Sequence, residues 1–303
     1  MRPLDRQIVY FNGRFLPAGR ACLSIFDRGI LYGDGIFETF RSYGGKLFRV
    51  RDHLGRLASS AKAVGMALPL PAERLHAILS ECLRRNQLRD ATLRLTITRG
   101  SGTPGDLAPR TDPAHTVFIT AKPISPPGPS QVRQGVAAVI IRRFRTDRQG
   151  VPPRSKTTSR LLGILARREA KDAGAFEGIL LNDKGEITEG TTTNIFWVRK
   201  GMLYTPPFRA GILPGITRAV TLEAARRIGL PVRLETGRPA RLYRADEVFL
   251  TGTSIEVLSV SGVDGRRIGT GRPGPVTRRL QEAFRQIVET ETHSKLAPPE
   301  KRR

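Results

Sequence analysis

The chain has 303 residues, of which 39% are hydrophobic and 26% are charged. This length suits two folded domains, and the composition excludes a disordered or fibrous protein. No run of about 18 apolar residues is present, so we expect no membrane span. The formal charge of +24 at pH 7 makes nucleic-acid binding the first non-enzymatic hypothesis to weigh.

The arginines, the cysteines and the first residues narrow the class of protein further. The arginines are spread along the chain without zinc-finger spacing or an aromatic RNA-binding motif, so we expect no specific nucleic-acid partner. Cys22 and Cys82 lie far apart and the histidines form no cluster, which predicts reduced thiols and no metal site. Residues 1–11 contain no apolar signal segment, and we therefore expect a cytoplasmic protein.

The first 123 residues are predicted to form a small N-terminal α/β domain. Asn12-Gly13 between apolar flanks is a hairpin signal over 8–15. Residues 36–41 alternate apolar and polar as a strand does, and a second hairpin leads to 47–50. The remaining patterns predict helices over 52–64 and 72–86, strands over 92–98 and 116–122, and a loop over 99–113.

Residues 135–289 are predicted to form a larger second domain. The segment 124–134 is rich in proline and has the composition of an interdomain linker. The tail 290–303 has too few apolar residues to fold alone, and we expect it to be mobile. Between them the patterns predict strands over 135–144, 178–181, 193–198, 202–204, 248–252 and 255–260, and helices over 160–173, 216–228 and 275–288.

Lys156 is the first candidate for chemistry. It lies among small hydroxyl residues, between a loop and a predicted helix. A lysine amine forms a Schiff base readily when burial or nearby positive charge lowers its pKa, and Arg154 and Arg160 could supply such charge. A single lysine is more often a solvated charge, so its partners decide the question.

Three downstream segments and one arginine could be those partners. Glu189 is either a turn carboxylate or the partner of a protonated pyridine nitrogen. Pro214–Thr217 opens a helix with a glycine and free amides, which suits an anion. Thr251–Ser254 ends a strand in a hydroxyl-rich turn that suits a phosphate or a carboxylate. Arg56 lies near the apolar face of an early predicted helix.

The order and spacing of these segments, together with Phe26–Glu38 and His53–Leu57, resemble the class IV aminotransferases. This family includes branched-chain amino-acid aminotransferase, D-amino-acid aminotransferase and aminodeoxychorismate lyase, and the resemblance covers residues 8–290. It implies a two-domain α/β (α+β) protein of fold type IV with a larger, barrel-like C-terminal domain. It also implies pyridoxal 5′-phosphate as cofactor, an amino acid and a 2-oxo acid as substrates, and an active site at a homodimer interface.

The resemblance implies a role for each residue of the site. Lys156 would form the Schiff base and shuttle the substrate's α-proton, and Glu189 would pair with the pyridine nitrogen. Tyr32 and Phe37 would shape substrate access. The phosphate would be held by Arg56, Gly215, Ile216, Thr217 and Thr253, with Asn194 in support, and the amides of Thr253 and Ser254 would place the substrate carboxylate.

Several positions distinguish the branches of the family. Arg160 stands about where many relatives have a tyrosine that contacts the cofactor's ring hydroxyl, and some lyase relatives have arginine there. Thr39 also resembles the lyase branch. Arg41 and Arg94 match arginines that branched-chain enzymes keep near the substrate carboxylate.

We therefore predict transamination of branched-chain or other hydrophobic amino acids, with aminodeoxychorismate lyase as the main alternative. The Arg-x-His pair of typical D-amino-acid enzymes is absent from 101–109. An atypical D-amino-acid or amine transaminase, in which Arg28 or Arg94 binds the carboxylate, remains a further alternative.

Overall fold

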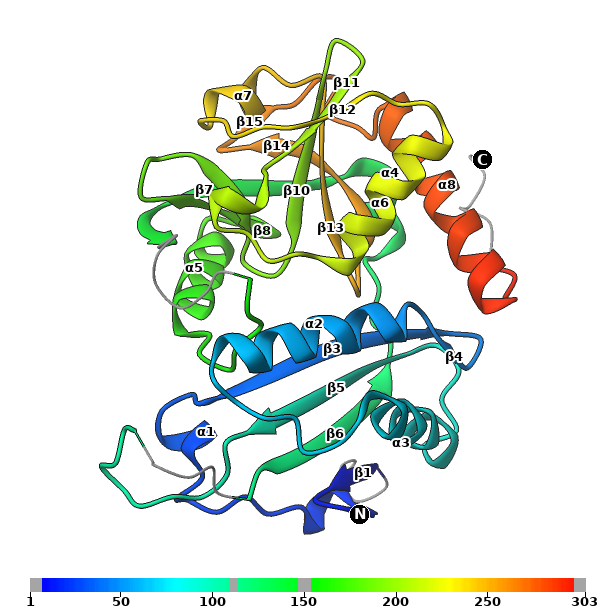
Figure 1. The fold of residues 1–303 in the computed structure, drawn as a ribbon. Helices are drawn as coiled ribbons and strands as arrows, with labels where there is room; N and C mark the ends of the chain where they lie inside the picture. The colour runs from blue at the N-terminus through cyan, green and yellow to red at the C-terminus, as the bar shows by residue number, and fades with distance from the viewer. Residues whose placement is uncertain (1–6, 109–113, 147–153, 297–303) are drawn as a thin grey trace.

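The computed structural model describes residues 7–108, 114–146 and 154–296, which form two β-sheets lying one above the other (Figure 1). The two layers are called here the N-terminal sheet and the C-terminal sheet. Within the described ranges, no helix combines the length and hydropathy needed to cross a bilayer.

The N-terminal sheet has six strands, all paired antiparallel, in the order β2-β1-β6-β5-β3-β4. The predicted hairpin at its edge is confirmed: Asn12 and Gly13 both have positive φ, as a tight two-residue turn requires. The strands are β1 (Ile8–Phe11), β2 (Arg14–Pro17), β3 (Gly35–Tyr43), β4 (Lys46–Leu47), β5 (Ala91–Thr98) and β6 (Thr116–Pro123).

Helices α2 (Val50–Ala63) and α3 (Ala72–Arg85) cover one face of this sheet, and the short α1 (Arg28–Leu31) precedes β3. Side chains alternate along β3, so Ile36 and Phe40 enter the core beneath α2 while Phe37 is directed to the opposite face. Figure 1 shows that α2 and β3 form the layer next to the C-terminal sheet.

The C-terminal sheet has nine strands in the order β12-β11-β10-β13-β14-β7-β8-β9, with β15 paired to β14. It mixes parallel pairs, such as β7 with β8 and β14, with antiparallel ones. Its strands are β7 (Val136–Thr146), β8 (Glu177–Asn182), β9 (Ile187–Gly190), β10 (Asn194–Arg199), β11 (Met202–Thr205), β12 (Val232–Leu234), β13 (Glu247–Gly252), β14 (Glu256–Val263) and β15 (Arg266–Arg267).

Helices cover the outside of this sheet. α6 (Ile216–Arg227) and α8 (Pro275–Thr292) share one core with Phe196 and Phe249, and α5 (Leu161–Asp172) packs on β7 and β8. A second core is built mainly from alternate strand residues, which include Trp197 and Leu250. A sheet that encloses its own side chains in this way is curled, so the predicted barrel-like α/β form is confirmed.

Several short elements after residue 123, such as β9, β12 and β15, lie where the patterns predict none. Glu189 is on β9, a strand of four residues that is too short for its alternation to be recognised. The segment 124–134, predicted as a linker, contains the helix α4 (Pro129–Gln134), which begins with proline as helices often do. A further short helix, α7 (Ala240–Tyr243), precedes β13.

The C-terminal end also differs from its prediction. α8 continues to Thr292, and Leu296 packs against the core shared by α6 and α8, so the first residues of the predicted tail are ordered by apolar contacts. The rest of that tail, and 109–113 of the predicted loop, lie outside the described residues.

Candidate active site

Lys156 lies in a loop that is hydrogen-bonded along the edge of β3. The Phe37 N–H donates to the Lys156 carbonyl at 2.9 Å, and the Thr158 N–H donates to the Gly35 carbonyl at 2.8 Å. The hydroxyl of Ser60 on α2 accepts from the Lys156 N–H at 3.0 Å. The loop therefore forms hydrogen bonds with the free edge of β3, and these bonds place Lys156 between the two sheets.

The Lys156 amine is half-buried, and Nζ lies 4.6 Å from the centroid of the Phe37 ring. Burial lowers the pKa of this amine to about 8; Glu38 opposes the lowering, and Arg56 and Arg160 add to it. An amine with this pKa is partly uncharged near neutral pH. The uncharged form is the one that attacks an aldehyde or accepts a proton.

The arginine predicted to bind phosphate is held by a buried carboxylate, Glu38. Arg56 donates from Nε and Nη2 to the two Glu38 oxygens at 2.7 and 2.8 Å, and His53 Nδ1 lies 2.8 Å from Oε2. Burial raises the pKa of Glu38, but the bonds from Arg56 and His53 outweigh burial and bring it to about 2. Arg56 Nη1 also donates to the Pro214 carbonyl at 2.8 Å, so its guanidinium group faces the start of α6.

Glu189 is fixed by two donors on one oxygen. The Leu213 N–H and Asn194 Nδ2 each donate to Glu189 Oε2 at 3.0 Å. Burial raises the pKa of Glu189 to about 7, against the opposing effects of the Leu213 N–H and of the charges on Arg160 and Lys156. Burial destabilises the ionised form of this carboxylate, so a cationic partner such as a protonated ring nitrogen stabilises it strongly.

The start of α6 offers donors to an anion. Gly215 is the N-cap and no described side chain caps the helix, so the N–H groups of Ile216 and Thr217 are free to bind. A Cβ on Gly215 would lie 1.9 Å from Asn194 Oδ1, so only glycine fits. Thr251 is paired with Asn194 in the ladder, and its buried hydroxyl has no partner among the described residues. These groups fit a phosphate.

The turn between β13 and β14 approaches the N-terminal sheet. The Ile255 N–H donates to the Gly252 carbonyl at 3.1 Å, which closes the turn around the half-buried Thr253 and Ser254. Arg41 Nη1 donates to the Ser254 carbonyl at 3.4 Å. The predicted carboxylate-binding turn therefore lies beside the strand that also carries Phe37.

The model of the family described as "Amino-transferase class IV" matches residues 35–263. The chain belongs to the class IV aminotransferases. The resemblance found in the sequence is thereby confirmed.

Named relatives of this aminotransferase match it over almost the whole chain. It is 40% identical over 279 residues to a putative branched-chain-amino-acid aminotransferase of Methanocaldococcus jannaschii, covering 92% of this chain and 96% of the relative. It is 36% identical over 289 residues to a D-alanine aminotransferase of Bacillus licheniformis, with coverages of 94% and 98%.

Solved structures agree with this family and fold. The crystal structure of Escherichia coli branched-chain amino acid aminotransferase superposes with a TM-score of 0.90 at 34% identity, covering 94% of this chain and 96% of that one. The branched-chain amino acid aminotransferase of Thermobaculum terrenum, solved in its PLP form, gives a TM-score of 0.84 at 27% identity and covers 95% of each chain.

Class IV aminotransferases use pyridoxal 5′-phosphate, and the residues of this aminotransferase fit that group. The uncapped start of α6, the unpartnered Thr251 hydroxyl and Arg56 suit its phosphate. Glu189 suits its ring nitrogen, and the Lys156 amine suits its aldehyde. The predicted cofactor is confirmed at the level of the family.

Phe37, Thr39 and Arg94 share one face of β3 and β5. Arg94 lies opposite Thr39 in the ladder, and its guanidinium carbon is 3.7 Å from the centroid of the Phe37 ring. Arg160 donates from Nη2 to the Thr191 carbonyl. Burial and, to a smaller extent, the positive charge of Arg160 lower the pKa of Arg94. Neither arginine forms an ion pair with a carboxylate of the described residues.

Two candidate residues, Arg28 and Tyr32, lie at the short helix α1. The Tyr32 hydroxyl accepts from the Gly105 N–H at 2.8 Å, and the Arg28 guanidinium carbon lies 5.1 Å from the centre of its ring. Arg28 is buried and paired with Asp34 at 2.9 Å. In the described part of the chain, no hydrogen bond or ring contact joins Tyr32 or Arg28 to Lys156.

Several residues that hold the site together were not predicted from the sequence. Glu38 is the clearest example. It lies on the core-facing side of β3 between Ile36 and Phe40, and a charged side chain is buried there only if it has a partner. His53 lies one helical turn before Arg56 and was readable from that spacing. Other such residues, Ser60, Tyr43 and Glu256, left no local signal because their partners are distant in the chain.

Proposed function

We propose that this aminotransferase transfers the amino group of a branched-chain or other hydrophobic amino acid to a 2-oxo acid. The observation that carries the proposal is the half-buried Lys156 amine, which lies beside Phe37, has a pKa of about 8 and is within electrostatic reach of Glu189. The branched-chain names of the Methanocaldococcus jannaschii relative and of the Escherichia coli structure described above support the substrate class.

We assign the cofactor-binding roles from the donors around Lys156. Arg56, the N–H groups of Ile216 and Thr217, and the Thr253 turn hold the phosphate. Glu189 keeps the ring nitrogen protonated, and Asn194 keeps Glu189 oriented through its bond at 3.0 Å. When bound, pyridoxal phosphate supplies the electron sink for carbanion chemistry.

Lys156 is the proposed catalytic base. Its Nζ accepts the α-proton of the bound amino acid and later returns a proton to the substrate. A pKa of about 8 suits both directions of transfer near neutral pH, because both protonation states are populated. Arg160 is the proposed partner of the cofactor's ring hydroxyl, since its positive charge stabilises a phenolate-like oxygen.

The substrate site is proposed to lie over β3. The Phe37 ring provides the apolar surface, and the N–H groups of the Thr253–Ser254 turn bind the α-carboxylate. Arg41 holds this turn, Arg94 adds positive charge near the carboxylate, and Thr39 completes the face opposite Arg94.

One observation favours aminodeoxychorismate lyase as a second candidate. The charge of Arg160 acts on Arg94, and neither arginine is paired with a described carboxylate, so together they could bind a substrate with more than one carboxylate. The first proton transfer to Lys156 is common to both reactions. They diverge in whether pyruvate is released by elimination.

The test is a half-reaction screen on the purified protein. L-leucine, D-alanine and aminodeoxychorismate are each added while the absorbance of the bound cofactor is followed. Bleaching by L-leucine is the expected result. Release of 4-aminobenzoate and pyruvate from aminodeoxychorismate, without bleaching by L-leucine, would overturn transamination.

Variants at two lysines test the assignment of the base. Lys156→Ala is expected to abolish the borohydride-reducible link between protein and cofactor, because no other amine is assigned to that role. Lys171→Ala changes an exposed lysine on α5 and is expected to behave as wild type. A reducible link that persists in Lys156→Ala would contradict the assignment.

We also propose a homodimer and a cytoplasmic location. Large apolar side chains of the described chain are exposed before and on α1 and on α5, including Ile25, Ile30, Leu161 and Ile164, and exposed apolar surface of this kind suits a protein contact. Ile164→Glu is expected to give a monomer by light scattering, whereas Lys171→Glu on the same helix is not. The location rests on the free thiols of Cys22 and Cys82.

A further inference from the structure

Glu256 occupies a backbone conformation that glycine or asparagine usually adopts. It follows the turn between β13 and β14, pairs with Gly252, and has φ of +54°. A left-handed backbone is unfavourable for a residue with a Cβ, and hairpin turns that need it commonly place glycine there. The glutamate side chain must therefore provide contacts that offset this cost.

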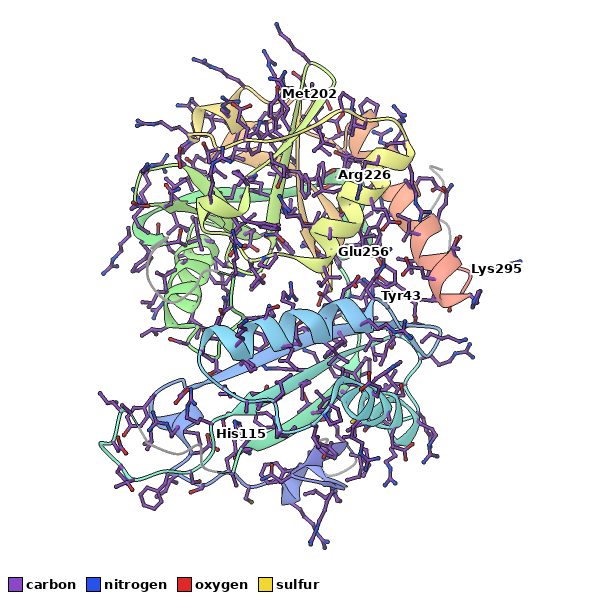
Figure 2. All side chains as sticks on the ribbon, viewed as in Figure 1. Tyr43, His115, Met202, Arg226, Glu256 and Lys295 are labelled. Atoms are coloured by element: carbon purple, nitrogen blue, oxygen red, sulfur yellow. The ribbon has the colours of Figure 1, made fainter. Side chains whose placement is uncertain are left out.

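Those contacts cross from the C-terminal sheet to the N-terminal sheet. Glu256 Oε1 accepts from the Tyr43 hydroxyl at 2.9 Å and forms an ion pair with Arg41 Nη1 at 3.0 Å. The Arg41 guanidinium carbon lies 4.4 Å from the centroid of the Tyr43 ring. Figure 2 shows Tyr43 and Glu256 facing each other where the two layers meet. Arg41, Tyr43 and Glu256 are called here the β3 clasp.

The clasp is anchored on both sides. Tyr43 is 2% exposed, and burial and the Glu256 charge raise its pKa, so the phenol remains a donor. Its carbonyl accepts from the Ser294 hydroxyl at 3.0 Å, just beyond α8. Arg41 also bonds the Ser254 carbonyl, which ties the Thr253–Ser254 turn itself to β3.

We propose that the β3 clasp positions the Thr253–Ser254 turn for binding the carboxylate of the amino acid or 2-oxo acid, with Glu256 as its positioning residue. The proposal rests on the function proposed above. Glu256 acts through Arg41 and Tyr43, since the same guanidinium group that meets its carboxylate also bonds the turn. Arg41 is thereby occupied in holding the turn.

The first test replaces Glu256 by glycine, which removes both bonds and also relieves the backbone strain. The KM for the 2-oxo acid and the Kd of 4-methylvalerate, a carboxylate without an amino group, are expected to rise about tenfold, the effect of one charge-assisted hydrogen bond. The kcat is expected to change much less. A KM within about twofold of wild type would overturn the proposal.

Lys200→Gly is the matched control. Lys200 is exposed and also has a positive φ, at +50°, in the β10–β11 hairpin, whose end carries Met202 at the far side of the C-terminal sheet (Figure 2). Lys200→Gly relieves the same kind of backbone strain without changing the β3 clasp, so the KM is expected to stay at the wild-type value. An equal rise in KM in this variant would show that strain relief alone is responsible, and would overturn the proposal.

Two further measurements distinguish a failure of the β3 clasp from a failure to fold and from a failure of the proposed function. Tyr43→Phe removes only one hydroxyl and is expected to raise KM about threefold with an unchanged melting temperature; an unchanged KM would count against the clasp. Hydrogen exchange of residues 251–257 needs no substrate and is expected to accelerate in Glu256→Gly. A wild-type protein that does not react or bind 4-methylvalerate would refute the proposed function, while unchanged exchange would refute the clasp.

Discussion

Replacing Glu38 is predicted to lower the free energy of unfolding strongly, because its carboxylate is fully buried and bonded by two side chains. In Glu38→Gln the side chain keeps its shape but loses its charge. Its amide nitrogen then faces donors on Arg56 or His53, which it cannot satisfy. The buried Arg56 guanidinium is left without its ionised partner.

The size of the effect follows by two routes. The fall in the pKa of Glu38 from 4.5 to about 2 corresponds to about 3 kcal/mol of stability. Breaking a buried ion pair by removing one partner costs about 3–5 kcal/mol. Since the pKa is lowered in the folded state, this stability is present above pH 4.5 and is lost as the pH falls towards 2.

The assay is urea unfolding of the cofactor-free protein, followed by circular dichroism between pH 3 and pH 7. The control is Glu81→Gln, because Glu81 also meets two arginines, Arg84 and Arg85, but on the exposed face of α3. Exposed pairs are screened by water and salt, so the control is expected to lose far less stability. Equal losses at pH 7, or a Glu38→Gln deficit that does not shrink on acidification, would refute the reasoning.

Three other predictions follow from the site. The pKa of about 8 for Lys156 means that its reaction with pyridoxal phosphate accelerates from pH 7 to 9 in stopped-flow absorbance; a midpoint near 10.5 would contradict this. Gly215→Ala forces a methyl group against Asn194 and is expected to weaken cofactor binding at least tenfold in a spectroscopic titration. Its control is Gly55→Ala in α2, where the added methyl group meets open space, and this variant is expected to stabilise the fold by about 0.5–1 kcal/mol. Because the pKa of Glu189 is raised in the folded state, its ionisation destabilises the folded protein as the pH rises from 4.5 through about 7. Glu189→Gln is therefore expected to stabilise the cofactor-free protein by about 1–3 kcal/mol at pH 8, measured by urea unfolding, and to give no gain at pH 4.

Local patterns were sufficient for most of the elements and for the family. The Asn12-Gly13 hairpin and the long helices follow from residue preferences and periodicity, which act within a few positions of the chain. The order and spacing of the segments around Lys156, Glu189, Pro214–Thr217 and Thr251–Ser254 were enough, together with Phe26–Glu38 and His53–Leu57, to recognise the aminotransferase family. Such signals survive without tertiary structure because each depends on neighbours in sequence.

The tertiary structure alone decided what surrounds those residues. The edge of β3 places the Lys156 loop, Glu38 orients Arg56, and Glu256 reaches Arg41 across more than 200 positions. The short strand carrying Glu189 is defined by its pairing with β8. The sequence by itself thus determined most of the elements, the family and the candidate residues. Burial, charge and distance between residues far apart in the chain exist only once the sheets pack, so they set the pKa values and the partners.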